Sequence, residues 1–187
     1  MSRARLKVRQ SFIAIGSNLG DRIANCFEAI GRLSCVRGIN LTDISSFYET
    51  EPVDMESDNL FINAVCCIKT AMEPEVLLDI LLDIEKRMGR DRSAGMDRTM
   101  DLDLLFMQGI LAGHEDFASG QGLVLPHPRA RERAFVLVPW AEIAPDLLVE
   151  PWGMTVKEML KALKPGGPGV QRIPWDVAPG LPERTAP

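Results

Sequence analysis

The chain has 187 residues, of which 46% are hydrophobic and 25% charged, a balance typical of an ordinary globular protein. Its formal net charge of -5 at pH 7 argues against a general nucleic-acid-binding protein, and 6% aromatic residues supply few side chains for stacking bases. The apolar run that follows the basic N-terminal residues is too short for a signal peptide or a membrane span. We therefore expect one cytoplasmic domain over residues 1–164 that binds neither nucleic acid nor membranes.

The first part of the chain alternates strand and helix patterns. Residues 11–16 predict a strand, and apolar side chains at helical spacing predict a helix over 21–37 that Asp21 caps. The segments 39–51 and 60–69 are rich in β-branched and aromatic residues and are separated by a polar turn. They predict two antiparallel strands.

The second part predicts three more helices and one more strand. Pro74 favours the start of a helix that Gly89 ends, and an Arg-rich loop then leads into a strand that begins near Asp101. Further helices are predicted at 130–143 and 156–163. The order β-α-β-β-α-β is that of a ferredoxin-like unit, so we expect an α+β fold with an antiparallel sheet flanked by helices in α/β/α layers.

The last 23 residues, 165–187, hold 6 of the 13 prolines and 4 of the 15 glycines, without an apolar period. Such a composition buries too little apolar surface to fold by itself. We expect an extended or disordered Pro/Gly-rich C-terminal tail.

Two carboxylates stand in a stretch that otherwise reads as a buried strand. Asp101 and Asp103 share one strand face, whereas the apolar side chains Leu102, Leu104 and Phe106 are expected on the other. Residues two apart lie roughly 6.5–7 Å apart along a strand, close enough for both carboxylates to reach one or two hard cations. An alternative is an edge strand whose carboxylates face water or pair with a neighbouring arginine.

The residues before this strand favour the metal interpretation. Arg90, Arg92 and Arg98 are the cationic side chains expected where Mg²⁺ and a protein share a polyphosphate. The four cysteines lack a CxxC spacing and the chain has two histidines, so a zinc site has little support. A hard, oxygen-liganded ion is the better prediction.

Four other residues are candidates for ligand binding. Phe61 and Asn63 fall on one strand face, where an amide can read the edge of a planar heterocycle and a ring can pack on its face. His127 lies between two prolines, and Arg133 follows in the same segment. A structural role in the core or in a turn is the alternative for each.

Taken together, five segments resemble the 6-hydroxymethyl-7,8-dihydropterin pyrophosphokinase family of folate biosynthesis. The resemblance extends from about residue 12 to residue 163. The matching segments are Phe12–Asn18 (FIAIGSN), Ser46–Thr50 (SFYET) with Pro52, Phe61–Ala64 (FINA), Arg98–Asp103 (RTMDLD) and Pro126–Phe135 (PHPRARERAF).

The resemblance implies transfer of a pyrophosphoryl group from ATP to the hydroxymethyl oxygen of the pterin, with release of AMP. We expect the enzyme to be a monomer. The resemblance also implies two Mg²⁺ ions held by Asp101 and Asp103, which are counted as catalytic together with Arg92 and Arg98. The implied ATP-binding residues are Glu85, Arg90, Arg92, Arg98, His127 and Arg133. The implied pterin-binding residues are Thr50, Val53, Phe61, Asn63 and Phe135.

One departure from the family concerns the loop before the signature arginine. The family usually has Gly-Pro there, often preceded by Trp, whereas this chain has Gly95, Met96 and Asp97 before Arg98. Without a tryptophan to seal the pterin, closure of this loop is expected to depend on charge pairs.

Two alternatives belong to other functional classes. A different two-metal nucleotidyl or phosphoryl transferase shares the use of Asp-x-Asp but does not explain Phe61 and Asn63. A non-catalytic ferredoxin-like regulatory or RNA-binding module is disfavoured because sheet-surface aromatics of the RNA-binding type are missing and Asp-x-Asp repels phosphates without Mg²⁺.

Overall fold

The computed structural model describes residues 7–91, 95–113, 122–164 and 169–174. In chain order its helices and strands are β1 (Arg9–Ser17), α1 (Arg22–Ser34), β2 (Ile39–Ile44), β3 (Tyr48–Thr50), β4 (Phe61–Thr70), α2 (Pro74–Arg87), β5 (Asp101–Met107), α3 (Ala134–Ile143), β6 (Leu148–Val149), β7 (Met154–Thr155), α4 (Val156–Ala162) and β8 (Val170–Arg172). In the part of the chain that the structure describes, no helix is long and apolar enough to cross a membrane.

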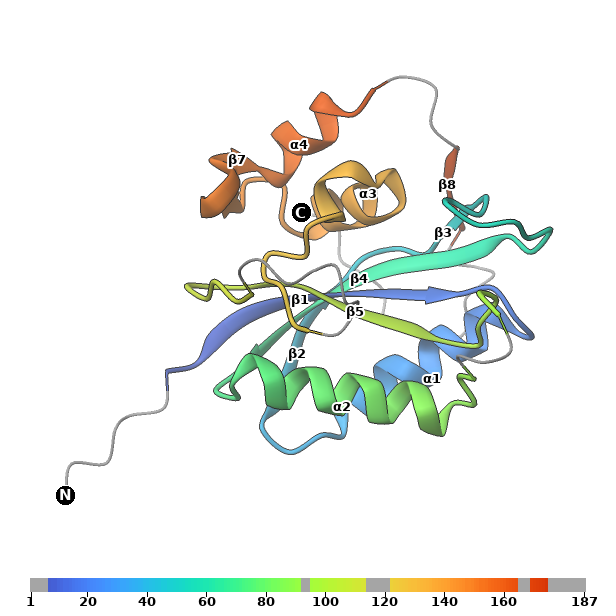
Figure 1. Cartoon of the computed structure of the whole chain (residues 1–187), viewed down its shortest axis with the longest axis horizontal. Coiled ribbons are helices and arrows are strands. Elements are labelled where there is room, and N and C mark those ends of the chain that lie inside the picture. The colour runs from blue at the N-terminus through green and yellow to red at the C-terminus, as the bar shows by residue number, and fades with distance from the viewer. Residues whose placement is uncertain (1–6, 92–94, 114–121, 165–168, 175–187) are drawn as a thin grey trace.

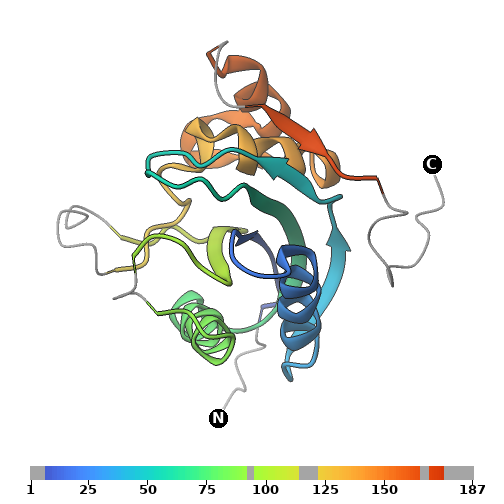
Figure 2. The same ribbon diagram turned by 90° about the vertical axis from the view of Figure 1, so that its right-hand side faces the viewer.

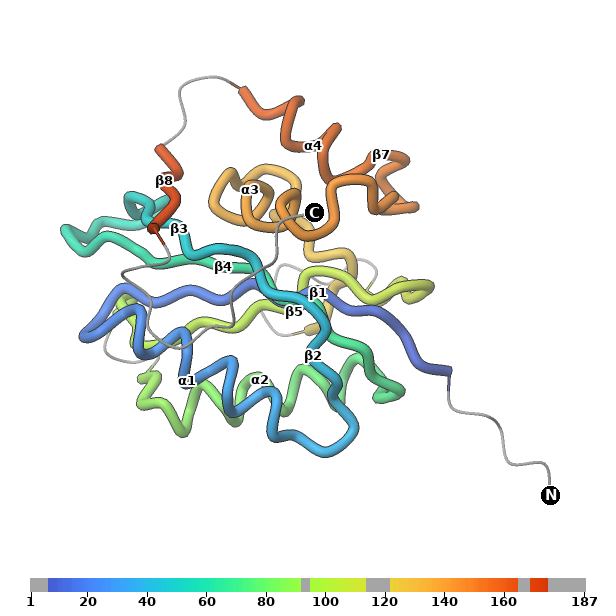
Figure 3. The backbone as a smooth tube through the Cα atoms, turned by 180° about the vertical axis from the view of Figure 1, so that it is seen from behind, coloured from blue at the N-terminus to red at the C-terminus, as the bar shows by residue number. Residues whose placement is uncertain are grey.

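The main sheet is antiparallel and lies between two helical layers. Its strand order is β5-β1-β4-β3-β8, and β2 also pairs with β4, beside β3. Helices α1 and α2 cover one face, and α3 covers the other with α4 packed outside it (Figure 1 and, from behind, Figure 3). The predicted α+β fold in α/β/α layers is confirmed.

Burial on both faces explains the sequence of the central strand. β4 is buried along nearly its whole length, as expected for a strand covered on both sides by helices. Side chains such as Ile13 and Leu81 form a core against α1 and α2, whereas Phe12 and Trp140 belong to a second core against α3 and α4. The view along the strands separates these layers (Figure 2).

The predicted strand over 39–51 is two strands, β2 and β3, because the ladder with β4 is interrupted at Ser45. The hydroxyl of Ser45 accepts a hydrogen bond from the backbone N–H of Val65, and the N–H of Ser45 donates to the Val65 carbonyl, both at 2.9 Å. Ser45 thus bonds to both the backbone N–H and the carbonyl of Val65, which interrupts the ladder of backbone hydrogen bonds between the strands.

The prediction for Phe106 was wrong because β5 contains a bulge. The register between β1 and β5 shifts between Phe12 and Ile13, which leaves Leu105 without a directly opposite residue. Leu102 and Leu104 therefore pack toward α2, as predicted, whereas Leu105 and Phe106 pack toward α3.

The predicted helix over 130–143 begins later than expected. Residues 130–132 form a 3₁₀ turn, and Arg133 has an extended backbone with φ -113° and ψ 112°. Helix α3 then starts at Ala134. The extended residue matters for the site, because it directs the Arg133 side chain.

Part of the predicted tail belongs to the sheet. β8 pairs with β3 over residues 170–172, and the backbone N–H of Ile173 donates to the Phe47 carbonyl at 2.9 Å. Three residues are too few to show an alternating pattern, so the sequence carried no signal for this strand. The domain boundary at residue 164 stays a prediction.

The side chain of Glu142 in α3 joins this edge of the sheet to the helix above it. It accepts hydrogen bonds from the backbone N–H of Ser46 at 2.7 Å, the Ser46 hydroxyl at 2.8 Å and the Tyr48 hydroxyl at 3.0 Å. Arg172 of β8 approaches the same carboxylate at 3.6 Å and donates to the Ser46 hydroxyl at 2.9 Å. Because Ser46 and Tyr48 are buried, their donors depend on this carboxylate.

We expect Glu142→Ala to lower the free energy of unfolding by about 1–3 kcal/mol, because buried donors lose their acceptor. Arg172→Ala should cost less than about 1 kcal/mol, since ion pairs of exposed side chains contribute little and this side chain is 56% exposed. Urea denaturation of both variants measures the difference, and an equal or larger loss in Arg172→Ala would contradict it.

Candidate functional site

The sheet brings three polar side chains into neighbouring rows on its α3 face. Gly16 of β1 lies opposite Asn63 of β4 and opposite Asp101 of β5, and the next row places Ala14 opposite Asp103. Opposite residues of paired strands point to the same side of a sheet. The shared face predicted for Asp101 and Asp103 is therefore present, and Asn63 joins it.

Gly16 keeps the floor between these side chains open. A Cβ atom at this position would lie 3.3 Å from Oδ1 of Asn63 and 3.8 Å from Cβ of Asp101. From the sequence, this glycine was named only within the matching segment Phe12–Asn18, so its place in the floor was missed. Its signal was the GSN motif, which was recognised but given no role.

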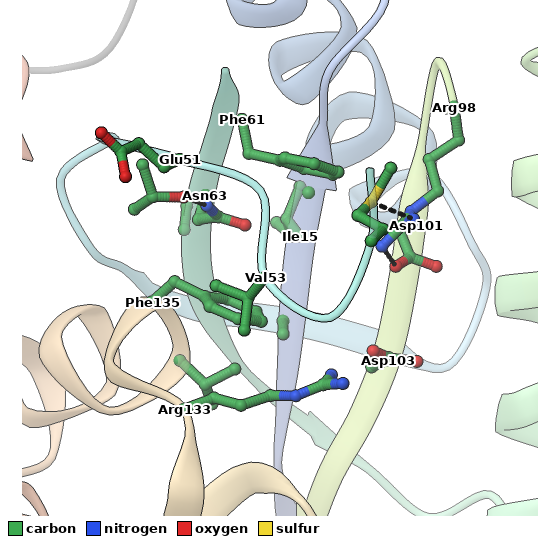
Figure 4. Close-up of a pocket in the computed structure, with 16 residues that line it drawn as sticks. Ile15, Glu51, Val53, Phe61, Asn63, Arg98, Asp101, Asp103, Arg133 and Phe135 are labelled. Carbon is green, nitrogen blue, oxygen red and sulfur yellow. Dashed lines mark hydrogen bonds and ion pairs between the residues drawn. The ribbon is translucent and has the colours of Figure 1, made fainter. Parts of the chain in front are cut away.

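A first pocket opens above this floor and encloses about 530 Å³, part of it open to solvent. Phe61 of β4 and Phe135 of α3 point into it from two sides, and Asn63 lies between them (Figure 4). Two residues of the loop after β3, Val53 and Met55, add to its wall. The other lining residues are Ala14, Ile15, Gly16, Thr50, Glu51, Ala64, Arg98, Asp101, Asp103, Arg133 and Val136.

Hydrogen bonding fixes the amide of Asn63. Its Nδ2 donates to the hydroxyl of Thr50 at 2.8 Å, and both residues are buried. The remaining amide atoms can donate to or accept from the edge of a planar ligand. This geometry suits a flat, polar heterocycle held between aromatic rings.

Two arginines pair with Asp101. Nη1 of Arg90 contacts its Oδ1, and Nη2 of Arg98 lies 2.8 Å from its Oδ2. Burial acts to raise the pKa of Asp101, but the positive charges of Arg98 and Arg90 outweigh it and lower that pKa. In Asp103, burial and the negative charge of Asp101 raise the pKa instead.

Glu85 holds Arg90 from behind. Its buried carboxylate accepts from the backbone N–H of Leu102 at 2.8 Å and from Nη1 of Arg90 at 3.1 Å. Arg90 also donates to the carbonyl of Met100 at 3.2 Å. Glu85 thereby ties α2 to the start of β5 and orients the arginine beside Asp101.

A second pocket lies on the outer edge of β5, which is the edge strand of the sheet. It is larger, about 1660 Å³ including space open to solvent, and Asp101 and Asp103 line it as well as the first pocket. Its other lining residues are Leu78, Leu82, Glu85, Lys86, Arg90, Leu102, Leu104, Gly122, Leu123, Val124 and His127. The two carboxylates therefore stand where the pockets meet.

His127 is fixed along the edge of β5. Its backbone N–H donates to the carbonyl of Leu105 at 2.8 Å, and its Nδ1 is buried with no hydrogen-bond partner among the described residues. Burial, although opposed by the charge of Asp103, lowers the pKa of His127. A buried polar atom without a partner at a pocket wall is available to a ligand.

Arg133 lies in the wall of the first pocket, where its side chain points toward Asp103 (Figure 4). Its guanidinium is 5.3 Å from the ring centre of Phe135 and 3.6 Å from a carboxylate oxygen of Asp54. Burial, followed by the nearby charge of Arg129, lowers the pKa of Arg133. From the sequence, Arg133 and His127 were assigned to one ATP site, but in the described structure they line separate pockets.

A family model described as 7,8-dihydro-6-hydroxymethylpterin-pyrophosphokinase (HPPK) matches residues 12–145. The chain belongs to this family. The 2-amino-4-hydroxy-6-hydroxymethyldihydropteridine pyrophosphokinase of Methylorubrum extorquens is 40% identical over 165 residues, which cover 88% of this chain and 98% of the relative. The protein of the same name from Bacillus subtilis is 41% identical over 134 residues, covering 71% of this chain and 77% of the relative.

A solved structure of Plasmodium falciparum HPPK-DHPS has the same fold, with a TM-score of 0.64 at 14% identity. The match covers 85% of this chain and 45% of that longer chain. The resemblance recognised in the sequence is thus confirmed for the family and the fold. The predicted class, an ATP-dependent pyrophosphokinase of folate biosynthesis, is confirmed with it.

The HPPK fold brings most of the predicted residues together. The first pocket contains the five residues predicted for the pterin, together with Arg98, Asp101, Asp103 and Arg133. The second contains Glu85, Arg90 and His127 with the same two carboxylates. Arg92 lies outside the described residues, so its predicted role stays a prediction.

Replacing each carboxylate by its neutral amide should change stability in opposite directions. Asp101→Asn is expected to lower the free energy of unfolding at neutral pH, because two arginines lose their anionic partner. Asp103→Asn is expected to raise it, because a group with a raised pKa is destabilising when ionised. This gain should vanish as the pH falls below the ordinary carboxyl pKa, where the folded and unfolded states both carry the proton.

Urea denaturation as a function of pH, without nucleotide or Mg²⁺, measures both effects. A shift of the same sign in both variants at neutral pH would contradict the electrostatic assignment of the pair.

Proposed function

We propose that the first pocket binds 6-hydroxymethyl-7,8-dihydropterin, that the second binds ATP, and that Asp101 and Asp103 hold Mg²⁺ between them. The observation that carries the proposal is that both carboxylates line both pockets. Transfer of a phosphoryl group requires attacking and leaving oxygens in line on opposite sides of the phosphorus. Two pockets that meet at a pair of carboxylates provide that arrangement.

The first pocket suits the pterin for chemical reasons. A pterin is a flat heterocycle whose edge carries hydrogen-bond donors and acceptors, and Asn63 offers an oriented amide to such an edge. The rings of Phe61 and Phe135 offer packing for its faces. Arg98, 5.0 Å from the ring centre of Phe61, closes the side toward Asp101.

The second pocket suits the nucleotide. Arg90 and Lys86 bring positive charge to a site whose carboxylates would otherwise repel phosphates. His127 provides a buried nitrogen without a partner among the described residues. Glu85 contributes indirectly, since it holds Arg90 by an ion pair of 3.1 Å.

The donor set fits Mg²⁺ rather than a closed protein cage. No group of three or more His, Cys, Asp and Glu side chains that could hold a metal is found among the described residues. Mg²⁺ is commonly bound by one or two carboxylates, with substrate phosphates and water as the other ligands. Bound there, two ions would neutralise the charge that develops on the transferred group.

The reaction then follows from the placement of the groups. The hydroxymethyl oxygen of the pterin attacks the β-phosphorus and gives up its proton to solvent, and the bond from this phosphorus to the bridging oxygen of the α-phosphate breaks, so that AMP leaves with the electron pair. Arg90 and Arg98, which pair with Asp101 in the structure, are positioned to move onto phosphate oxygens. The number of metal ions, the roles of Arg92 and Arg98 as catalytic residues, the monomeric state and the cytoplasmic location stay predictions.

Asp101→Ala or Asp103→Ala should reduce turnover roughly 10³-fold or more, because each removes charge compensation needed in the transition state. The assay follows AMP release from ATP and hydroxymethyl-dihydropterin with and without Mg²⁺. Asp79→Ala, which changes an exposed carboxylate on α2, serves as the control. Near-normal, Mg²⁺-dependent turnover in either site variant would rule out the proposed metal ligands.

The two pockets should also be separable by substitution. Asn63→Ala is expected to weaken binding of the pterin much more than binding of a non-hydrolysable ATP analogue, because it removes the hydrogen bonds to the ring edge. His127→Ala should show the reverse preference. Calorimetric titrations in which both variants lose the two ligands equally would count against the division.

A further inference from the structure

The carboxylate of Asp97 connects three segments that are distant in the sequence. Its Oδ1 accepts from Nδ2 of Asn18, which follows β1, at 2.6 Å. Its Oδ2 accepts from Nδ2 of Asn59, which precedes β4, at 2.9 Å. A hydrogen bond from Ser57, together with those from Asn18 and Asn59, lowers the pKa of Asp97.

Asn18 makes a second connection to the same segment. Its Oδ1 accepts from the backbone N–H of Arg98 at 2.7 Å, and its own N–H donates to the Arg98 carbonyl at 3.1 Å. Asn18 is buried, so these bonds are shielded from water. Residues 97 and 98 are thereby fixed to the end of β1.

The position of Arg98 depends on this attachment. From its fixed backbone the side chain reaches over the ring of Phe61 at 5.0 Å and pairs with Asp101 at 2.8 Å. The same guanidinium approaches the sulfur of Met55 at 3.9 Å. Arg98 thus contacts three parts of the first pocket: Asp101 in the floor, Phe61 at one side and Met55 in the loop.

The loop that carries Val53 and Met55 is held where its two ends meet and by one further hydrogen bond. Arg22 donates to the Leu60 carbonyl at 2.9 Å and pairs with Glu49 at 3.0 Å, which joins the two ends of the loop over residues 51–59. Between these ends the loop carries Val53 and Met55 into the pocket. The bond from Asn59 to Asp97 attaches this loop to the segment before β5.

We propose that Asp97 is a positioning residue that fastens the loop over residues 51–59 to the end of β1, so that the pterin pocket is assembled before the pterin binds. The inference rests on the proposed assignment of the pterin to the first pocket. A preformed wall lowers the entropy lost on binding and so strengthens affinity. The described residues that line the second pocket do not include Asp97, Asn18 or Asn59, so ATP binding should depend on the connection only through Arg98, and less than pterin binding does.

For this role both carboxylate oxygens of Asp97 must accept hydrogen bonds. Asp97→Leu keeps a branched side chain of similar size and removes both acceptors from the amide donors of Asn18 and Asn59. The isosteric variant should therefore fail as Asp97→Ala does, whereas a role in filling space alone would be rescued by it. Asp58→Asn, which neutralises an exposed carboxylate in the same loop, is the matched control for charge.

The dissociation constants of the pterin, with a non-hydrolysable ATP analogue present, and of that analogue alone are measured for each variant. Asp97→Ala and Asp97→Leu should weaken pterin binding about tenfold and binding of the analogue much less, since only Arg98 connects Asp97 to the phosphates. The KM for the pterin should rise by more than kcat falls. Adding Asn59→Ala to Asp97→Ala should cost nothing further, since the bond is already lost.

Amide hydrogen exchange of the free protein tests the attachment without ligands. The N–H groups of Asn18 and Arg98 should exchange slowly in the parent protein and fast in Asp97→Ala, while those in β1 and β4 keep their protection. Unchanged exchange at Asn18 and Arg98, rescue by Asp97→Leu, or equal weakening of both ligands would overturn the proposal.

Asn63→Ala separates this proposal from the one on which it rests. Unchanged pterin affinity in Asn63→Ala would refute the pocket assignment, and amide exchange would still decide whether Asp97 fastens the loop. Weakened affinity in Asn63→Ala with unchanged affinity in Asp97→Ala would refute the role of Asp97 alone.

Discussion

Two carboxylates on one face of an edge strand impose the main constraint on this structure. Asp101 and Asp103 repel each other across a single intervening residue, and each is partly removed from water. Asp101 is compensated by Arg90 and Arg98, whereas the charges of His127 and Arg133 do not outweigh the effects of burial and of Asp101 on Asp103. Because the two carboxylates are compensated unequally, the pKa of Asp101 is lowered and that of Asp103 is raised. Ionised Asp103 therefore destabilises the free protein.

The surrounding elements can be understood as supports for this compensation. Glu85 uses its buried carboxylate to hold Arg90, and the same group accepts from the backbone of β5. Asn18 and Asp97 hold the backbone of Arg98 from the other side. A site that gathers like charges therefore requires rigid neighbours, because a displaced arginine would leave Asp101 buried without a counter-charge.

Much of the architecture followed from local patterns in the sequence. Asp21 caps α1 as predicted, with its carboxylate accepting from Ala24 at 3.0 Å, and the period-two pattern correctly placed both site carboxylates on one face. The failures occurred where a tertiary contact overrides the pattern. Ser45 splits one expected strand through its hydrogen bonds to Val65, and the bulge at Leu105 reverses the face of Phe106.

Site residues could be predicted where the residue type is unusual for its secondary structure, as with carboxylates in a strand. Asn18 and Gly16 were not predicted as site residues, because asparagine and glycine are ordinary in a turn and only the fold shows what they contact. β8 was missed for a similar reason, since it is held by backbone pairing with β3 rather than by an apolar pattern of its own.

The overall acidity of the chain gives the local arrangement of charges a further consequence. A protein of net charge -5 repels a polyanion such as ATP at long range, so attraction must arise close to the site. Arg90 and Arg98 are held within hydrogen-bond distance of Asp101, which keeps them ordered and partly neutralised until a ligand arrives. A carboxylate that holds two arginines in this way lowers the entropic cost of arranging them around phosphate, because their side-chain entropy has already been lost on folding. The same pairing that stabilises the free fold thus prepares the groups that the proposed phosphate site would use.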